Sequence, residues 1–140
     1  MSVYLDASVI MPTLVVEGAT TAVAAYLRGT TAGLLVSEFV AAEVASGISR
    51  LLRMKDLSLD EAQRALSRFD AWRASDTTSI AIENDDIGVA HRIVRRFELK
   101  LRAPDALHLA LCLRAGAQLA TLDGDLAYAA THLGASVASP

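Results

Sequence analysis

The sequence has few cysteines, few aromatic residues and no apolar run long enough to cross a membrane. Its single cysteine, Cys112, excludes an internal disulfide and a cysteine-rich zinc site, and it favours a reducing, cytoplasmic location. Aromatic residues make up 5% of the chain, which argues against a stacking platform for single-stranded bases. No basic segment precedes the apolar residues 3–5, so we expect no secretory signal.

Several common catalytic signatures are also missing. There is no glycine-rich phosphate loop before a lysine, and no serine elbow of the hydrolase kind. The three histidines, His91, His108 and His132, form no ligand pair at helical spacing, which disfavours zinc. Phosphotransfer of the haloacid-dehalogenase kind needs a second aspartate two residues after Asp6, where this chain has Ser8.

The net charge of −3 does not by itself indicate nucleic-acid binding. Basic residues nevertheless gather near residue 95, and Arg92, Arg95 and Arg96, hereafter the basic group, have the spacing of one helix face. We predict that the basic group contacts RNA. The alternative is an ordinary solvated face.

At 140 residues the chain is long enough for one domain with a full core, and we expect a single domain over residues 1–140. Apolar patterns and turn residues predict strands and helices in alternation. The expected strands are 3–6, 33–37, 77–82, 118–122 and 135–138. A short helical turn and a helix are expected over 8–28, and further helices over 38–53, 58–74, 84–99, 104–115 and 125–132. This alternation predicts an α/β fold in which helices cover both faces of a parallel sheet.

Four acids occupy positions that such a fold would bring together. Asp6 closes an apolar strand, and Asp123 follows another. Glu43 lies at the edge of the apolar stripe of its helix, and Asp105 opens a helix that is apolar all round and therefore buried. Each acid has an ordinary explanation as a cap, a turn or a surface residue, but together they point to one crevice at the carboxyl ends of the strands.

A carboxylate cluster predicts a hard divalent cation, because buried carboxylates are costly unless they are paired or metal-bound. Magnesium, or manganese as a substitute, takes oxygen ligands and keeps several waters. Ser8 would then bind a ligand water or cap the following turn. For His108 we favour a satisfied core histidine, although its spacing from Asp105 would also let it face the crevice.

At these residues the chain resembles the PIN-domain nucleases, and most of all the VapC-type toxins of bacterial toxin–antitoxin pairs. The segment VYLDASVIMPTLVVE is similar to the start of the family, with its acid at Asp6 and its small hydroxyl at Ser8. The segment VSEFVAAEVASGISR is similar to the second motif and matches its acid to Glu43. The segment LRAPDALHLALCLRAGAQLATLDGDL matches the remaining acids to Asp105 and Asp123.

The resemblance implies an α/β/α sandwich with a five-stranded parallel sheet and magnesium-dependent endoribonuclease activity. It implies that Asp6, Glu43, Asp105 and Asp123 are the catalytic, metal-binding residues. Ser8, Thr121 and Asp125 are auxiliary residues in this comparison. It further implies a homodimer and a small antitoxin protein that blocks the active-site groove. A PIN-type nuclease of RNA processing and a catalytically silent binding module remain alternatives.

Overall fold

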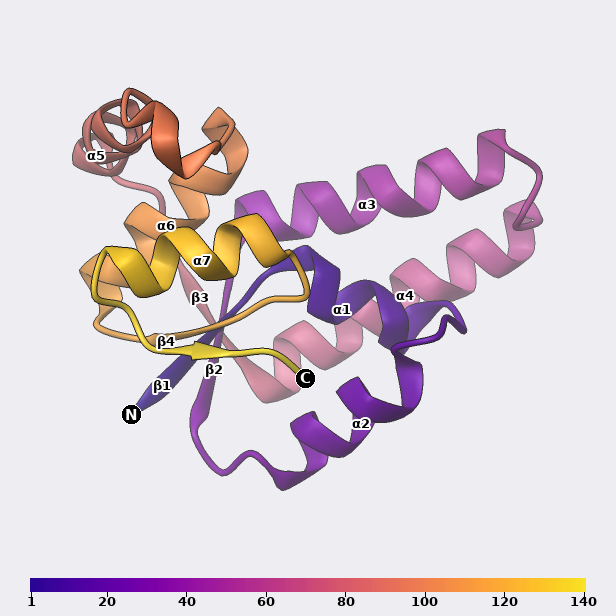
Figure 1. Cartoon of the computed structure of the whole chain (residues 1–140). Coiled ribbons are helices and arrows are strands. Elements are labelled where there is room, and N and C mark those ends of the chain that lie inside the picture. The colour runs from indigo at the N-terminus through magenta and orange to yellow at the C-terminus, as the bar shows by residue number, and fades with distance from the viewer.

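Strand β1 (Ser2–Leu5) lies at the centre of a five-stranded sheet in the computed structural model, which describes residues 1–140 (Figure 1). The strand order is β3-β2-β1-β4-β5, and every neighbouring pair is parallel. The other strands are β2 (Gly33–Ser37), β3 (Thr77–Ile80), β4 (Gln118–Ala120) and β5 (Val137–Ala138).

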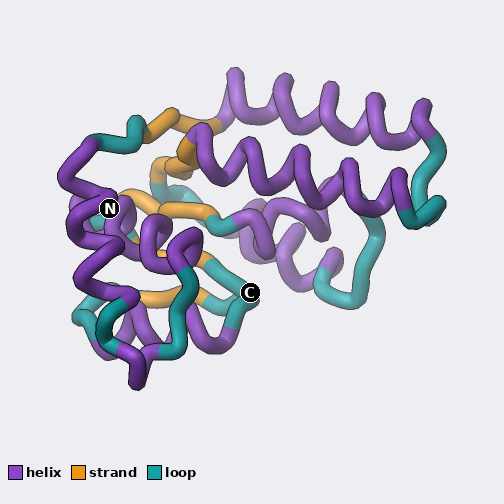
Figure 2. The backbone as a smooth tube through the Cα atoms, turned by 90° about the horizontal axis from the view of Figure 1, so that it is seen from above, coloured by secondary structure: helices purple, strands orange, loops and turns teal.

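Helices lie on both sides of this sheet (Figure 2). They are α1 (Ala7–Leu14), α2 (Thr20–Gly29), α3 (Glu38–Arg53), α4 (Leu59–Asp76), α5 (Asn84–Val94), the short 3₁₀ helix η1 (Phe97–Leu99), α6 (Ala103–Ala115) and α7 (Gly124–His132). Helices α1 to α4 pack against one another, whereas α5 packs along α6 and α6 also contacts α7. None of these helices combines the length and the apolar character that a bilayer crossing requires.

The parallel five-stranded sheet with helices on both faces confirms the predicted α/β class.

The core is built around the central strand and the helix that crosses it. Val3, Tyr4 and Leu5 of β1 are all buried, as expected for a parallel strand covered on both faces. In α6, every residue from Ala106 to Cys112 is buried, so the prediction of a helix buried all round is confirmed. Burial of α6 also brings its first turn to the edge of the sheet.

The strand order reverses beside β1, and this reversal places the site. From β1 the chain moves outward to β2 and β3, and then returns to β4 on the other side of β1. The carboxyl ends of β1 and β4 therefore leave the sheet side by side while their connections run in opposite directions. Ligands of open parallel sheets bind at such a switch point. Asp6 follows β1 there, and Thr121 follows β4.

The short helical turn and the helix expected over residues 8–28 correspond to α1 and α2, and residues 15–19 lie between these two helices. One predicted helix differs from the structure. The expected helix 84–99 was wrong in its second part. Helix α5 ends at Val94, Arg95 is its C-cap, and Arg96 has φ −84° and ψ 81°, outside the helical region.

Candidate functional site

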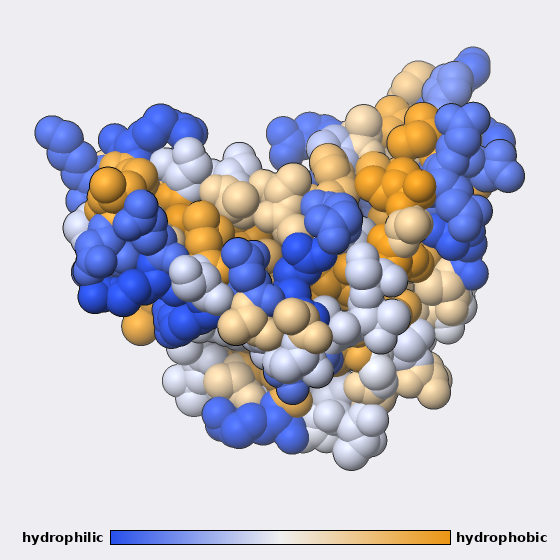
Figure 3. All heavy atoms as spheres, turned by 180° about the vertical axis from the view of Figure 1, so that it is seen from behind, coloured by the Kyte–Doolittle hydropathy of each residue, from blue (hydrophilic) through white to orange (hydrophobic).

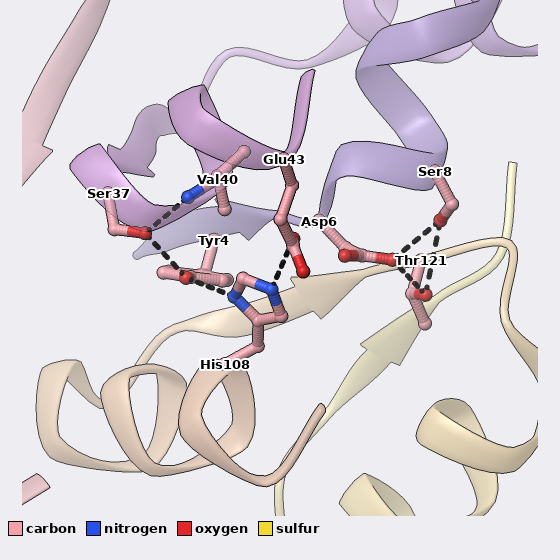
Figure 4. Close-up of polar contacts among 8 residues, drawn as sticks. All are labelled: Tyr4, Asp6, Ser8, Ser37, Val40, Glu43, His108 and Thr121. Carbon is pink, nitrogen blue, oxygen red and sulfur yellow. Dashed lines mark hydrogen bonds and ion pairs between the residues drawn. The ribbon is translucent and has the colours of Figure 1, made fainter. Parts of the chain in front are cut away.

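Asp6 is held at the end of β1 by two hydroxyl groups. Its side chain is 7% exposed. Ser8 Oγ donates a hydrogen bond to Asp6 Oδ2 at 2.6 Å, and Thr121 Oγ1 donates to the same oxygen at 2.9 Å (Figure 4). The second carboxylate oxygen points toward Glu43 in the same view. Asp6 is thus fixed through one oxygen and presents the other to the centre of the site.

The two hydroxyls are themselves oriented by the backbone. Ser8 Oγ accepts from Leu122 N at 2.9 Å, and Thr121 Oγ1 accepts from Asp123 N at 3.0 Å. Each hydroxyl has one proton, and the backbone donors leave that proton for Asp6. These contacts make both residues structural supports of Asp6. Their auxiliary role in the site stays a prediction.

Glu43 approaches from α3 and meets a histidine. Its Oε2 lies 2.6 Å from His108 Nε2, and His108 Nδ1 lies 2.8 Å from the hydroxyl of Tyr4. One ligand atom from each of Asp6, Glu43 and His108 falls within 4.8 Å of the others. Burial raises the pKa of the Tyr4 hydroxyl well above its usual range, so this group stays protonated. His108 is buried and hydrogen-bonded, as we favoured, and it also faces the crevice.

Asp105 lies in the first turn of α6, close enough to Asp6 and Asp123 for their charges to act on it. Burial, followed by the nearby charges of Asp123 and Asp6, raises the pKa of the Asp105 carboxyl against the opposing effect of Arg102. The direction of this shift shows that burial, with the charges of Asp123 and Asp6 added to it, outweighs the stabilisation of the carboxylate by Arg102. Asp123 is the N-cap of α7, and its Oδ1 accepts from Leu126 N at 3.0 Å.

The donor set fits a hard divalent cation better than zinc. The groups that converge are mostly carboxylates, which magnesium and manganese prefer. A bound cation would offset both the burial of the Asp105 carboxylate and the charges of Asp123 and Asp6 near it. Asp125 lies exposed in the first turn of α7 and makes no hydrogen bond to the other acids. Its auxiliary role stays a prediction.

Comparison with known proteins agrees with this geometry. A family model described as "PIN domain" matches residues 3–131. The chain belongs to the PIN-domain family. The resemblance stated from the sequence is thereby confirmed, although no curated protein matched.

Solved structures share the PIN fold at low sequence identity. FitAcB from Neisseria gonorrhoeae has a TM-score of 0.76 at 18% identity, with 99% of this chain and 97% of that chain covered. VapC20 from Mycobacterium tuberculosis, described as a sarcin-ricin loop cleaving toxin, has a TM-score of 0.75 at 18% identity, with 99% of each chain covered. VapBC2 from Rickettsia felis, solved with promoter DNA, has a TM-score of 0.70 at 13% identity, covering 99% of this chain and 98% of that one.

The basic group of this PIN domain does not form one helix face. Arg92 lies in the last turn of α5, but Arg95 caps the helix and Arg96 lies beyond it. Arg96 Nε also pairs with Glu98 Oε1 at 3.0 Å. All three arginines remain exposed, so their contact with RNA stays a prediction that now rests on charge rather than on helical spacing.

An apolar groove of about 390 Å³ lies between residues of α3, α5 and α6 of this PIN domain. It is lined by Phe39, Ile87, Ala90, His91, Val94, Ala103, Pro104 and Leu107. From behind, apolar atoms gather on the side formed by α5 and again toward the far end of α3 and α4 (Figure 3). Pro104 and Leu107 of the groove belong to α6, the helix that also carries Asp105.

Sequence reasoning missed Tyr4 and Ser37. Tyr4 reads as a core residue of an apolar strand, and Ser37 as the N-cap of a helix. Their hydroxyls nevertheless meet at 3.0 Å behind His108. A tyrosine inside a buried strand is a usable signal, because a buried phenol hydroxyl generally finds a partner.

Proposed function

We propose that this PIN domain is a magnesium-dependent endoribonuclease and the toxin of a toxin–antitoxin pair. The observation that carries the proposal is the convergence of Asp6 and Glu43 at the switch point of the sheet, with Asp105 close enough to feel the charges of Asp6 and Asp123. Family membership supports nuclease chemistry, and the similarity to VapC20, a toxin that cleaves RNA of the sarcin-ricin loop, supports RNA as the substrate.

Each acid has a part that follows from its position. Asp6 and Glu43 lie closest together and would hold the cation from two sides. Asp105 and Asp123 would close the site from the α6 and α7 sides, where their mutual repulsion favours a cation between them. When bound, the metal lowers the pKa of a water ligand and stabilises charge on the phosphate. Manganese is expected to substitute, because it takes the same donors.

The partners are proposed on the same basis. We expect RNA as substrate, a small antitoxin protein as inhibitor, and the cytoplasm as location. We also expect a homodimer, and the groove lined by Ile87, which is 51% exposed, supplies an apolar surface for a second copy. Sedimentation of wild type and Ile87→Lys tests the dimer, since a buried lysine should shift the sample toward monomer.

The nuclease proposal is tested by cleavage of total RNA with magnesium or with chelator. Asp6→Asn should lose several orders of magnitude of activity, because it alters a group that holds the reacting centre. Asp60→Asn is the matched control, since Asp60 pairs with Arg64 on the exposed surface of α4 at 2.7 Å. Full cleavage by Asp6→Asn in magnesium would refute the metal-nuclease mechanism.

The toxin role needs a separate experiment. Induction of the wild type in a host should arrest growth, and sequencing of RNA ends should locate the cut sites. Asp6→Asn should do neither. Cleavage in vitro without growth arrest would instead favour a nuclease of RNA processing, and absence of cleavage with intact RNA binding would favour a silent module.

A further inference from the structure

A continuous row of hydrogen-bonded side chains runs from the sheet to Glu43. Val40 N lies 3.1 Å from Ser37 Oγ, Ser37 Oγ lies 3.0 Å from the Tyr4 hydroxyl, and that hydroxyl lies 2.8 Å from His108 Nδ1 (Figure 4). The row ends where His108 Nε2 meets Glu43 Oε2 at 2.6 Å. Tyr4 and Ser37 are fully buried, and His108 is 1% exposed.

The need to satisfy every polar atom sets the direction of these hydrogen bonds. The amide of Val40 can only donate, so Ser37 Oγ accepts from it, and the one remaining partner for the Ser37 proton is the Tyr4 hydroxyl. Tyr4 then donates to His108 Nδ1. A neutral imidazole has one donor nitrogen and one acceptor nitrogen, so Nε2 carries the proton and donates to the Glu43 carboxylate. Every polar atom of the row is satisfied in this arrangement.

Glu43 needs such an anchor. Its side chain is 30% exposed and could turn into water from the edge of α3. A glutamate side chain has several rotatable bonds, and holding it in one position costs conformational entropy. A charge-assisted hydrogen bond from a fully buried ring is the strong, fixed contact that would offset this cost.

We infer that His108 is a positioning residue, which holds Glu43 toward Asp6 while Tyr4 and Ser37 fix the orientation and tautomer of its ring. This inference rests on the proposed metal site. His108 does not itself bind the cation in this arrangement, because both ring nitrogens are engaged by Tyr4 and Glu43. It acts as an outer partner of a ligand, and such partners commonly affect metal affinity.

The test compares two variants of His108 by calorimetric titration of the full chain with magnesium chloride. His108→Leu keeps a similar volume but removes the donor, and should weaken magnesium binding about 10- to 100-fold. His108→Gln keeps an amide N–H near the position of Nε2 and should recover most of the affinity. Cys112→Ala is the control, because Cys112 is equally buried in α6 but its thiol hydrogen-bonds to the carbonyl of Ala117 and not to Glu43. It should bind magnesium like the wild type.

Two further measurements separate positioning from packing. His108→Leu should regain cleavage at high magnesium, whereas a packing defect would not respond to the metal. In a Glu43→Gln background, His108→Leu should cause no additional loss of affinity, since the group it positions has already changed. Long-range ¹H–¹⁵N spectra of the wild type should show the proton on His108 Nε2.

The outcomes are distinct from those of the nuclease test. The inference would be overturned if a folded His108→Leu variant bound magnesium as tightly as the wild type. It would also be overturned if His108→Gln bound magnesium no better than His108→Leu, or if the spectra showed no proton on His108 Nε2. A wild type that binds magnesium with the expected variant pattern but cuts no RNA would refute the proposed function and leave the role of His108 standing.

Discussion

Substitution of Asp105 by asparagine should change stability in opposite directions with and without metal. Asp105 has a raised carboxyl pKa, caused first by burial and then by the charges of Asp123 and Asp6. A raised carboxyl pKa means that the fold binds the proton more tightly than the unfolded chain does. The stabilisation is complete below the unfolded pKa and is lost as pH rises through the folded pKa. At pH 7 the charge therefore opposes folding, and Asp105→Asn in chelator should melt at or above the wild type.

With metal the order should reverse. A cation that binds only the folded state at 100 times its dissociation constant adds about 2.7 kcal/mol of stability. For a chain of this size that corresponds to a rise of about 10 °C in Tm. If the lost carboxylate weakens binding about 100-fold, the same magnesium concentration adds only about 0.4 kcal/mol to the variant, or a rise of ~1–2 °C.

The assay is thermal unfolding of both proteins in chelator and in a magnesium series, followed by far-ultraviolet circular dichroism. Asp60→Asn serves as control and should follow the wild type in both conditions, because exposed ion pairs contribute little. If Asp105→Asn gains as many degrees from magnesium as the wild type does, the cation does not bind at this cluster. A variant that melts well below the wild type in chelator would show that Asp105 is a structural cap rather than part of a repulsive group.

Three other expectations concern separate parts of the molecule. Replacing the basic group with alanine should reduce the slope of log binding constant against log salt concentration for RNA by up to about 2, as measured by fluorescence anisotropy. An unchanged slope would show that these arginines are ordinary solvated residues. Arg114 forms bonds of 2.8 and 3.0 Å to Asp86, which is 2% exposed. Burial would raise the pKa of Asp86, but Arg114 and the backbone N–H of the helix cap outweigh it and lower that pKa. The pair thus stabilises the fold fully at pH values above the unfolded pKa of about 4, and this stabilisation is lost as the pH falls below it. Arg114→Met should therefore lower Tm at pH 7, and the difference in Tm between the variant and the wild type should become smaller in acid. Leu109→Ala, fully buried in α6, should cost about 2–5 kcal/mol in urea unfolding without changing magnesium affinity.

Local signals predicted much of the fold. The strand 33–37 and the helix 38–53 were predicted with the bounds that the structure has, and the capping box of Ser58 and Glu61 is present. Such features depend on neighbouring residues, so the sequence displays them directly. The end of α5 has no such signal. No glycine or proline follows Val94, and the residue with positive φ is Lys100, at 57°. Leu99 of η1 is buried, and this contact with the core depends on the tertiary fold rather than on local spacing.

The candidate site likewise contains residues that local patterns predict and contacts that they do not. Its acids could be predicted, because each one follows an apolar strand or starts or lines an apolar helix. The contact of Glu43 with His108 joins residues 65 positions apart, and that of Tyr4 with His108 joins residues 104 positions apart. Nothing in local spacing encodes those pairs. They arise because α6 crosses the sheet beside β1, which is a property of the topology.

The two outer strands of the sheet are short, and this limits how other chains can bind. Strand β5 has two residues and β3 has four, so each edge offers few free backbone donors and acceptors. Arg114 Nη2 also donates to Ala81 O at 2.6 Å, which occupies a carbonyl just beyond β3. Short, occupied edges discourage aggregation through strand pairing. A protein partner would therefore have to recognise helices and side chains here, rather than extend the sheet by adding a strand of its own.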